Sequence, residues 1–172
     1  WLRLRGQESL SSVNRVSLLA RKLTGLDAEI TTKLEFEPEI FQHSAGLVLY
    51  YDNMNYVWLR KYWSETLGTA ALAVQEVERG VKTDHNNTRI PAPEGPVFLR
   101  LCIEGRDFCF SWSCDGENWQ KIGPVFKTWH LSDEYSMYGE FTGTMTGIAC
   151  TDAMFRKKCA DFDYFEYIEK IE

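Results

Sequence analysis

Residues 27–37 read DAEITTKLEFE and alternate between two kinds of side chain over their whole length. One set of alternate positions is mostly apolar and comprises Ala28, Ile30, Thr32, Leu34 and Phe36. The positions between them are mostly charged. Because successive side chains of a strand point to opposite faces, this period of two predicts a half-buried antiparallel strand. Pro38 ends it, since proline has no N–H for a ladder hydrogen bond.

Similar short runs lie on both sides of this stretch, with turn residues between them. They cover residues 2–6, 16–21, 45–51, 56–63, 69–78, 97–104, 107–114, 119–122, 145–150 and 162–168. Residues 45–51 (AGLVLYY) are apolar on both faces, as expected for a central strand. Residues 80–95 and 127–138 are expected to be connections. Roughly ten short strands at this spacing predict an antiparallel β-sandwich of jelly-roll type. We expect the last two runs in the sheet centres, because a closing strand returns beside earlier ones.

The composition narrows the possible functions. A length of 172 residues predicts one domain, residues 1–172, and 44% hydrophobic residues allow a packed core. A formal charge of −6 argues against nucleic-acid binding, which needs clustered Lys and Arg. No run of apolar residues is long enough for a membrane span. The first residues lack the apolar region of a signal peptide, and a start at Trp1 is expected for a processed or trimmed piece.

The cysteines predict neither a metal site nor a catalytic one. There are five cysteines without a CxxC pair, and the three histidines do not cluster with them, so a zinc site is not expected. A two-residue turn at Gly105-Arg106 would place Cys102 opposite Cys109. Free thiols in a reducing cytosol are the favoured interpretation, with a bridge between these two left open.

The chain lacks the common catalytic motifs. It has no GxSxG and no phosphate-binding glycine loop. Asp161 and Asp163 flank one residue of the last predicted strand, and Asp152 comes one strand earlier; acids on one side could bind calcium. The alternative is that they cap the strand end and pair with the basic residues 156–158. We therefore expect no catalytic residue, no metal and no cofactor.

Aromatic residues gather in the hairpin of residues 50–63. Tyr56, Trp58 and Tyr62 could form a platform on which sugar rings stack. The alternative is ordinary core packing, because strands buried on both faces are rich in aromatic residues.

Phe141 stands in a short segment between Gly139 and Gly143. Glycines on both sides indicate a tight, exposed turn, because glycine adopts backbone angles that other residues avoid. A large apolar side chain on such a turn needs a partner. That partner lies either in another domain or inside its own sandwich.

Several stretches together resemble one family. They are LRLRG at 2–6, SLLAR at 17–21, KLEFEP at 33–38, AGLVLYYD at 45–52, SxDGxxW at 113–119, GEFTG at 139–143 and ADFDYFEY at 160–167. In this order they are similar to the C-terminal domain of family 43 glycoside hydrolases, in the β-xylosidase branch. The resemblance implies a concanavalin A-like β-sandwich that follows a catalytic domain.

The resemblance also implies a function that the chain would share with a partner domain. The catalytic domain of the family is an N-terminal five-bladed propeller with three carboxylates, and this sequence contains none of it. We expect the first strand of the sandwich to be missing as well. The implied reaction is the inverting release of xylose from the non-reducing end of xylo-oligosaccharides. In the family, a Phe of the sandwich helps to wall the shared pocket; the matching residue is Phe141, in a loop shaped by Gly139, Thr142 and Gly143.

The resemblance leaves alternatives open. The parent enzyme could be a β-xylosidase or a related arabinofuranosidase, cytoplasmic and a homo-oligomer. Alternatively, the chain could be a free-standing carbohydrate-binding module or lectin, or a structural sandwich that mediates oligomerisation. Exposure of Tyr56, Trp58 and Tyr62 in an open groove would favour the binding module, whereas their burial would favour the accessory domain.

Overall fold

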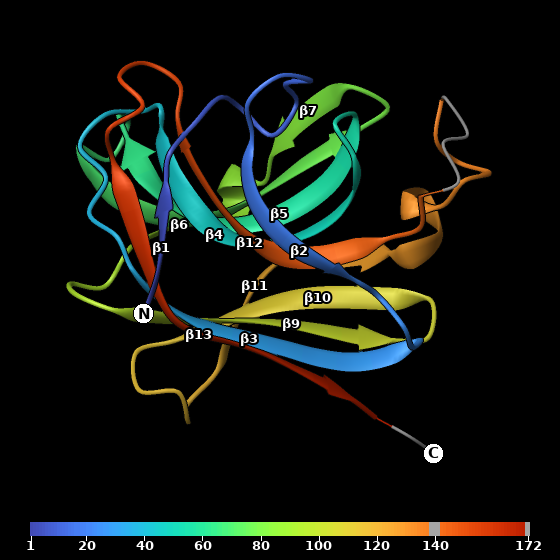
Figure 1. The fold of residues 1–172 in the computed structure, drawn as a ribbon. Coiled ribbons are helices and arrows are strands. Elements are labelled where there is room, and N and C mark those ends of the chain that lie inside the picture. Colours follow the sequence, from blue (N-terminus) through green and yellow to red (C-terminus); the bar gives the residue numbers. More distant parts are fainter. Residues whose placement is uncertain (138–141, 171–172) are drawn as a thin grey trace.

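A computed structural model describes residues 1–137 and 142–170, and in it two antiparallel sheets are stacked face to face (Figure 1). The six-stranded sheet has the order β1 (Leu2–Arg5), β13 (Cys159–Glu169), β3 (Asp27–Glu35), β9 (Val97–Glu104), β10 (Asp107–Ser113) and β11 (Gln120–Lys127). The seven-stranded sheet has the order β2 (Ser17–Lys22), β12 (Met145–Asp152), β4 (His43–Asp52), β5 (Asn55–Ser64), β6 (Thr69–Glu78) and β7 (Val81–Asp84), with β8 (Ile90–Pro91) paired to β6. The predicted antiparallel β-sandwich is therefore confirmed.

The helical content is small. Two short 3-10 helices, η1 (Asn86–Thr88) and η2 (Thr128–Leu131), interrupt the connections. Among the described residues, no helix is both long and apolar enough to cross a membrane.

Strand β3 follows the alternation of its sequence. Ala28, Ile30 and Leu34 are fully buried and face the seven-stranded sheet, as the period of two predicts. Leu34 lies in register with Val97 of β9 and with Phe162 of β13, so three adjacent strands present apolar side chains together. Burial of such cross-strand sets is what holds one sheet onto the other.

Strand β4 is buried on both of its faces, as the sequence predicts for residues 45–51. Leu47 and Leu49 enter the core between the sheets. Val48 points to the outer face of the seven-stranded sheet, where Leu10 of the preceding segment covers it. Because the segment that carries Leu10 shields Val48 from water, this outward-facing position is apolar.

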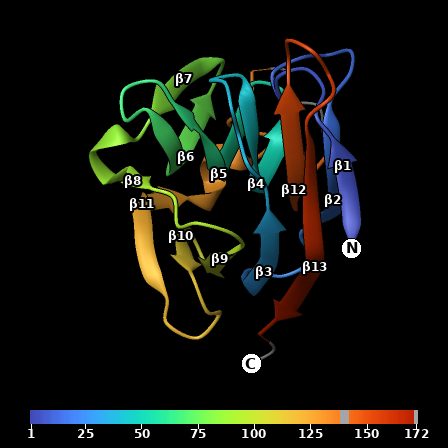
Figure 2. The same ribbon diagram turned by 90° about the vertical axis from the view of Figure 1, so that its left-hand side faces the viewer.

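The two closing strands each have a neighbour on both sides, but they lie second from the edge of their sheets and not in the centre as expected. β12 pairs with β2 and β4, and β13 pairs with β1 and β3. Figure 2 shows the two strands side by side in different layers, joined by the turn of residues 153–158. The last third of the chain therefore connects the two sheets.

The region 80–95 differs from the expectation of an irregular connection, since β7, η1 and β8 lie within it. β7 is exposed along its whole length, and among the described strands it pairs with β6 alone. An edge strand of this kind buries neither face, so its sequence does not have to alternate between apolar and polar residues. The periodicity that predicts other strands is therefore missing here.

The predicted hairpin with opposed cysteines is confirmed. Cys102 of β9 lies directly opposite Cys109 of β10, and both are free thiols. Burial raises the pKa of the Cys102 thiol, which keeps it protonated and less reactive.

The turn between β12 and β13 is organised by one buried carboxylate. Asp152 is 1% exposed and accepts backbone N–H groups from Phe155, Lys157 and Lys158 at 3.0, 2.8 and 3.0 Å. Burial alone would raise the pKa of Asp152, but these three donors lower it to about 2. The charged form of Asp152 therefore stabilises the turn that joins the sheets.

Asp152→Asn tests this contribution. The amide cannot accept three N–H groups as the carboxylate does, so we expect urea unfolding near neutral pH to show a loss of about 2 kcal/mol in the free energy of unfolding. Because the folded pKa lies below the unfolded value of about 3.9, the wild-type advantage should be full above about pH 4 and shrink as the pH falls toward 2.

The matched control is Asp163→Asn, which removes a surface ion pair with Lys33 at 3.5 Å. It should change stability by well under about 1 kcal/mol. Equal losses for the two variants would contradict a special role for Asp152.

Candidate functional site

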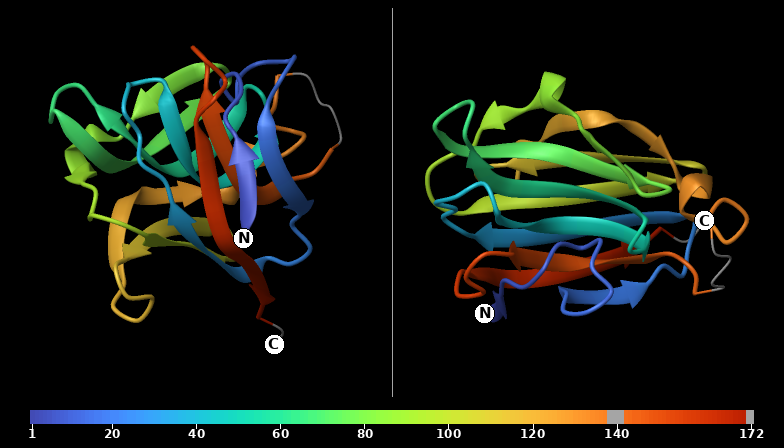
Figure 3. Two further views of the ribbon diagram at one scale, coloured as in Figure 1. Left: turned by 60° about the vertical axis from the view of Figure 1, so that its left-hand side comes forward. Right: turned by 90° about the horizontal axis from the view of Figure 1, so that it is seen from above.

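The candidate site is the end of the sandwich where residues 128–144, here named the η2 loop, connect β11 to β12. Figure 3 shows this loop at one end of the strands and the turn of residues 153–158 at the other. Gly139 and Phe141 belong to the η2 loop but lie outside the described residues. Thr142 and Gly143 are described, and Gly143 has a φ of 74°, a conformation that favours glycine.

Buried side chains and backbone groups hold the two arms of the η2 loop. The hydroxyl of Tyr51, in the core-facing part of β4, donates to Oδ1 of Asp133. Across the loop, the Thr144 hydroxyl donates to the Leu131 carbonyl at 2.7 Å, and the Leu23 N–H donates to the Thr144 carbonyl at 2.9 Å. Burial, followed by the bond to Asp133, raises the pKa of Tyr51, so this hydroxyl remains a donor at neutral pH.

A second set of contacts centres on Tyr135. Its hydroxyl donates to Oε1 of Glu78 at 2.5 Å, and its ring stacks on His130 with centroids 4.5 Å apart. The guanidinium of Arg79 lies 3.9 Å over the same ring, and Arg79 Nε donates to the Tyr135 carbonyl at 3.0 Å. The hydrogen bond to Glu78 is the main cause that raises the pKa of Tyr135. Ring stacking, cation–π contact and hydrogen bonds thus fix the base of the loop.

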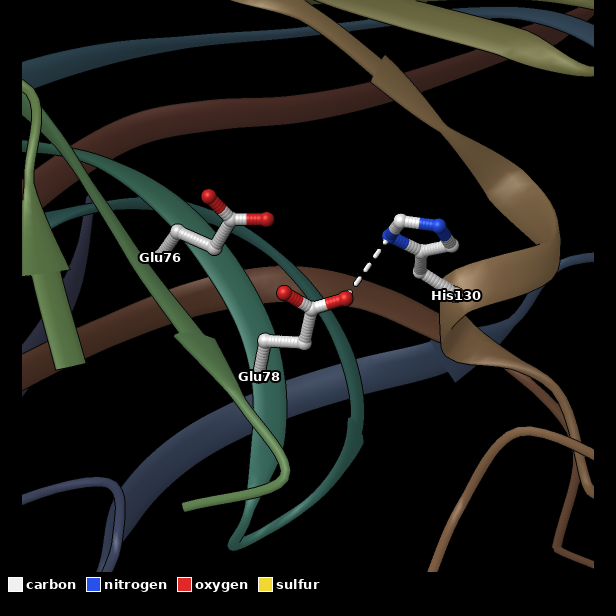
Figure 4. Close-up of side chains that lie close together, drawn as sticks. All are labelled: Glu76, Glu78 and His130. Atoms are coloured by element: carbon white, nitrogen blue, oxygen red, sulfur yellow. Dashed lines mark ion pairs between the residues drawn. The ribbon is translucent and has the colours of Figure 1, made fainter. Parts of the chain in front are cut away.

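Two carboxylates and an imidazole converge at this base (Figure 4). Glu76 and Glu78 continue the face of β6 that carries Leu72 and Val74 into the core. His130 comes from η2, and its Nδ1 lies 3.0 Å from Glu78 Oε1. One ligand atom from each of the three residues lies within 4.8 Å of the others. They line a cavity of about 190 Å³ between β6 and β11, with an apolar wall that includes Phe108 and Phe126.

Sequence reasoning did not identify this group. The available signal was the position of Glu76 and Glu78 on the inward face of a strand, where apolar residues are expected. His130 could not be associated with them, because it comes from a connection in the other half of the chain.

The three aspartates named as calcium candidates are not brought together. Asp152 holds the turn described above, Asp161 forms a bidentate pair with Arg3 at 2.6 Å, and Asp163 pairs with Lys33. Hydrogen bonding to Arg3 is the main cause that lowers the pKa of Asp161. Within the described part of the chain, the Glu76, Glu78 and His130 group is the only one with metal-ligand spacing.

The three rings named for sugar stacking are buried. Tyr56, Trp58 and Tyr62 are 2%, 3% and 8% exposed, although they line shallow cavities on the outer face of the seven-stranded sheet. Tyr56 hydrogen-bonds Ser11 at 2.9 Å, and the Arg60 guanidinium lies 4.2 Å over Tyr62. Sugar stacking here stays a prediction, and the rings as placed offer little free face.

The η2 loop carries its own exposed apolar residues. Trp129 and Met137 are 50% and 57% exposed. Trp129 is nevertheless held edge-on against His130, with ring centroids 4.0 Å apart. An exposed aromatic ring that also packs against its neighbours is a candidate for a contact surface.

Comparisons with known proteins agree on one family. Residues 1–168 match the family described as "Beta xylosidase C-terminal Concanavalin A-like domain". A β-xylosidase of Bacillus subtilis (strain 168) is 37% identical over 171 residues, which cover 98% of this chain and 32% of that protein. A xylan 1,3-β-xylosidase of a Vibrio species is 34% identical over 170 residues, again 98% of this chain and 32% of the relative.

A solved structure has the same fold. The crystal structure of a xylan β-1,4-xylosidase from Bacillus halodurans C-125 superposes with a TM-score of 0.92 and 41% sequence identity. The match covers 97% of this chain and 32% of that protein. The chain thus spans about a third of the length of these relatives.

Tyr51→Phe tests the anchoring of the η2 loop. Loss of the hydroxyl removes the donor to Asp133, a hydrogen bond to a charged group with a typical value of about 1.5–3 kcal/mol. We expect faster amide hydrogen exchange in residues 132–137, measured by mass spectrometry, while the core strands keep their protection.

Tyr164→Phe is the matched control, because it removes a hydroxyl from β13, outside the loop end. It should leave exchange in residues 132–137 unchanged. Unaltered exchange in Tyr51→Phe would show that this bond does not hold the loop.

Proposed function

The chain belongs to the family of β-xylosidase C-terminal concanavalin A-like domains, and we propose that it is the accessory domain of an enzyme that releases xylose from xylo-oligosaccharides. The observation that carries the proposal is the match of nearly the whole chain to proteins named as β-xylosidases. The length of those proteins is the second support, since the chain corresponds to only about a third of each.

The proposed partner is an N-terminal catalytic domain of the five-bladed propeller type. Such a domain would supply the general acid and base, which an inverting glycosidase holds far enough apart to admit a water. The sandwich itself would contribute packing rather than acid–base chemistry. This division agrees with the described acidic residues of the sandwich, most of which are occupied in turns and ion pairs such as those of Asp152 and Asp161.

The η2 loop is the proposed contact with the substrate pocket, and Phe141 is its proposed tip. The contacts of Tyr51 and Tyr135 support this role, because a residue that shapes a pocket must be presented from a fixed base. The exposed Trp129 and Met137 support it as well, since they would gain burial against a neighbouring domain.

In this proposal Phe141 acts through exclusion of water and positioning of the sugar. Its ring has no proton to transfer, so it cannot act as an acid or a base. An apolar wall that closes a pocket at one end favours release of single terminal units and lowers the local dielectric around the charged groups of the partner domain. Gly139, Thr142 and Gly143 would shape the turn that presents the ring.

Phe141→Ala in the full-length enzyme should lower kcat/KM for xylobiose by at least about 10-fold, because lost apolar contacts in a pocket are worth about 1–3 kcal/mol. Steady-state kinetics with xylobiose measure the effect. The thermal unfolding temperature should stay within a few degrees of wild type.

Phe155→Ala is the matched control: Phe155 is an exposed phenylalanine in the turn between β12 and β13, outside the η2 loop. It should leave kcat/KM unchanged. Normal kinetics in Phe141→Ala would exclude a role for this ring in the pocket.

The 172-residue chain alone should release no xylose from p-nitrophenyl xyloside, because it lacks the proposed acid and base. The assay measures p-nitrophenol, with the full-length enzyme at equal molarity as the positive control. Activity that copurifies with the folded chain would overturn the accessory assignment.

A further inference from the structure

The group formed by Glu76, Glu78 and His130 has imidazoles, and no lysine or arginine, as its ion-pair partners among the described residues. His85 lies 3.0 Å from Glu76, and His130 lies 3.0 Å from Glu78. The nearby cations are engaged elsewhere. Lys127, which lines the same cavity, pairs with Asp107 at 2.5 Å, and Arg79 lies over Tyr135.

The two carboxylates are also partly withdrawn from water. The side chains of Glu76 and Glu78 are 19% and 37% exposed, and that of His130 is 29% exposed. Phe108 and Phe126 form the apolar wall behind them. A cation bound between two adjacent carboxylates would interact favourably with both of them.

The donor atoms indicate which cation would fit. One imidazole nitrogen and two carboxylate oxygens form a mixed set of ligand types that Zn²⁺ accepts, and the cavity of about 190 Å³ leaves room for a water in the fourth position. Calcium prefers six to eight oxygen ligands and does not select imidazole. We propose that Glu76, Glu78 and His130 bind a divalent transition-metal ion, Zn²⁺ in the first instance.

Two further side chains are placed as supports for the ligands. His85 Nε2 lies 3.0 Å from Glu76 Oε2, and the Tyr135 hydroxyl donates to Glu78 Oε1. Contacts of this kind orient ligating carboxylates, and their loss typically weakens metal affinity by about 10–100-fold. His130 is oriented by its ring contacts with Tyr135 and Trp129.

The site would link two parts of the fold. Glu76 and Glu78 belong to β6, whereas His130 belongs to η2 at the start of the η2 loop. A bound ion would therefore fasten the base of that loop to the seven-stranded sheet (Figure 4). The metal site does not depend on the proposed glycosidase function, because its evidence lies wholly within the sandwich.

The experiment titrates Zn²⁺ into the chelator-treated 172-residue chain and follows binding by calorimetry and by competition with a chromophoric chelator. We expect one equivalent to bind and to raise the thermal unfolding temperature, with reversal by EDTA. Glu76→Gln, Glu78→Gln and His130→Asn should each weaken binding by about 100-fold or more. His85→Asn should weaken it by about 10–100-fold.

Glu104→Gln is the matched control, since Glu104 is an exposed glutamate at the end of β9. It should bind Zn²⁺ as wild type does. Circular dichroism should show that each variant keeps its β-sheet signal before titration.

Substitution with Co²⁺ separates this site from the free cysteines. Binding at Glu76, Glu78 and His130 should give visible ligand-field bands without a thiolate-to-cobalt charge-transfer band. Absence of Zn²⁺ binding at about 0.1 mM, binding that survives His130→Asn, or a thiolate band would each overturn the proposal. None of these outcomes bears on the kinetics of Phe141→Ala, so the two proposals fail independently.

Discussion

The contact between the apolar inner faces of the two sheets is the interaction on which the other features of this domain depend. Leu34, Leu47, Leu99, Phe110 and Ile148 meet there and are buried almost completely. Burial of these side chains sets the register of every strand that contributes one, because a slip of one residue would turn the apolar set toward water. The strand register fixes where each strand ends. It thereby also fixes where the turns and loops lie.

At the loop end of the sandwich the same inner face stops being apolar. On β6, Leu72 and Val74 belong to the core, and Glu76 and Glu78 follow on the same side where the cavity between β6 and β11 opens. The alternation of side chains along β6 therefore places two carboxylates at the base of the η2 loop. Partly buried carboxylates need hydrogen-bond partners, and His130, His85 and Tyr135 supply them. Polar side chains gather at this end of the sandwich because the apolar core ends there.

A loop with a well-anchored base, together with a buried aromatic row, suits an accessory domain better than a free binding module. The contacts of Tyr51, Tyr135 and Thr144 hold the two arms of the η2 loop. The aromatic row of Tyr56, Trp58 and Tyr62 is covered by its own chain. The exposed groups of the loop end, Trp129 and Met137, lie next to the segment that bears Phe141 in the sequence. The exposed side chains of the loop end and the burial of the aromatic row therefore favour the same end of the sandwich as the family resemblance does.

Local patterns determined the fold class, most of the strands and the facing pair Cys102 and Cys109, because strand periodicity and short turns depend on residues close together in the chain. The glycine neighbours and the family motif also singled out Phe141, whose role stays a prediction because it lies outside the described residues. Local patterns missed β7, whose exposed positions do not alternate between apolar and polar residues. They also grouped Asp152, Asp161 and Asp163, whereas each of these aspartates has a different partner in the structure. The convergence of Glu76, Glu78 and His130 was decided by tertiary structure alone. It depends on β6 and β11 meeting across the sandwich, and residues distant in the chain come together only once the sheets have packed.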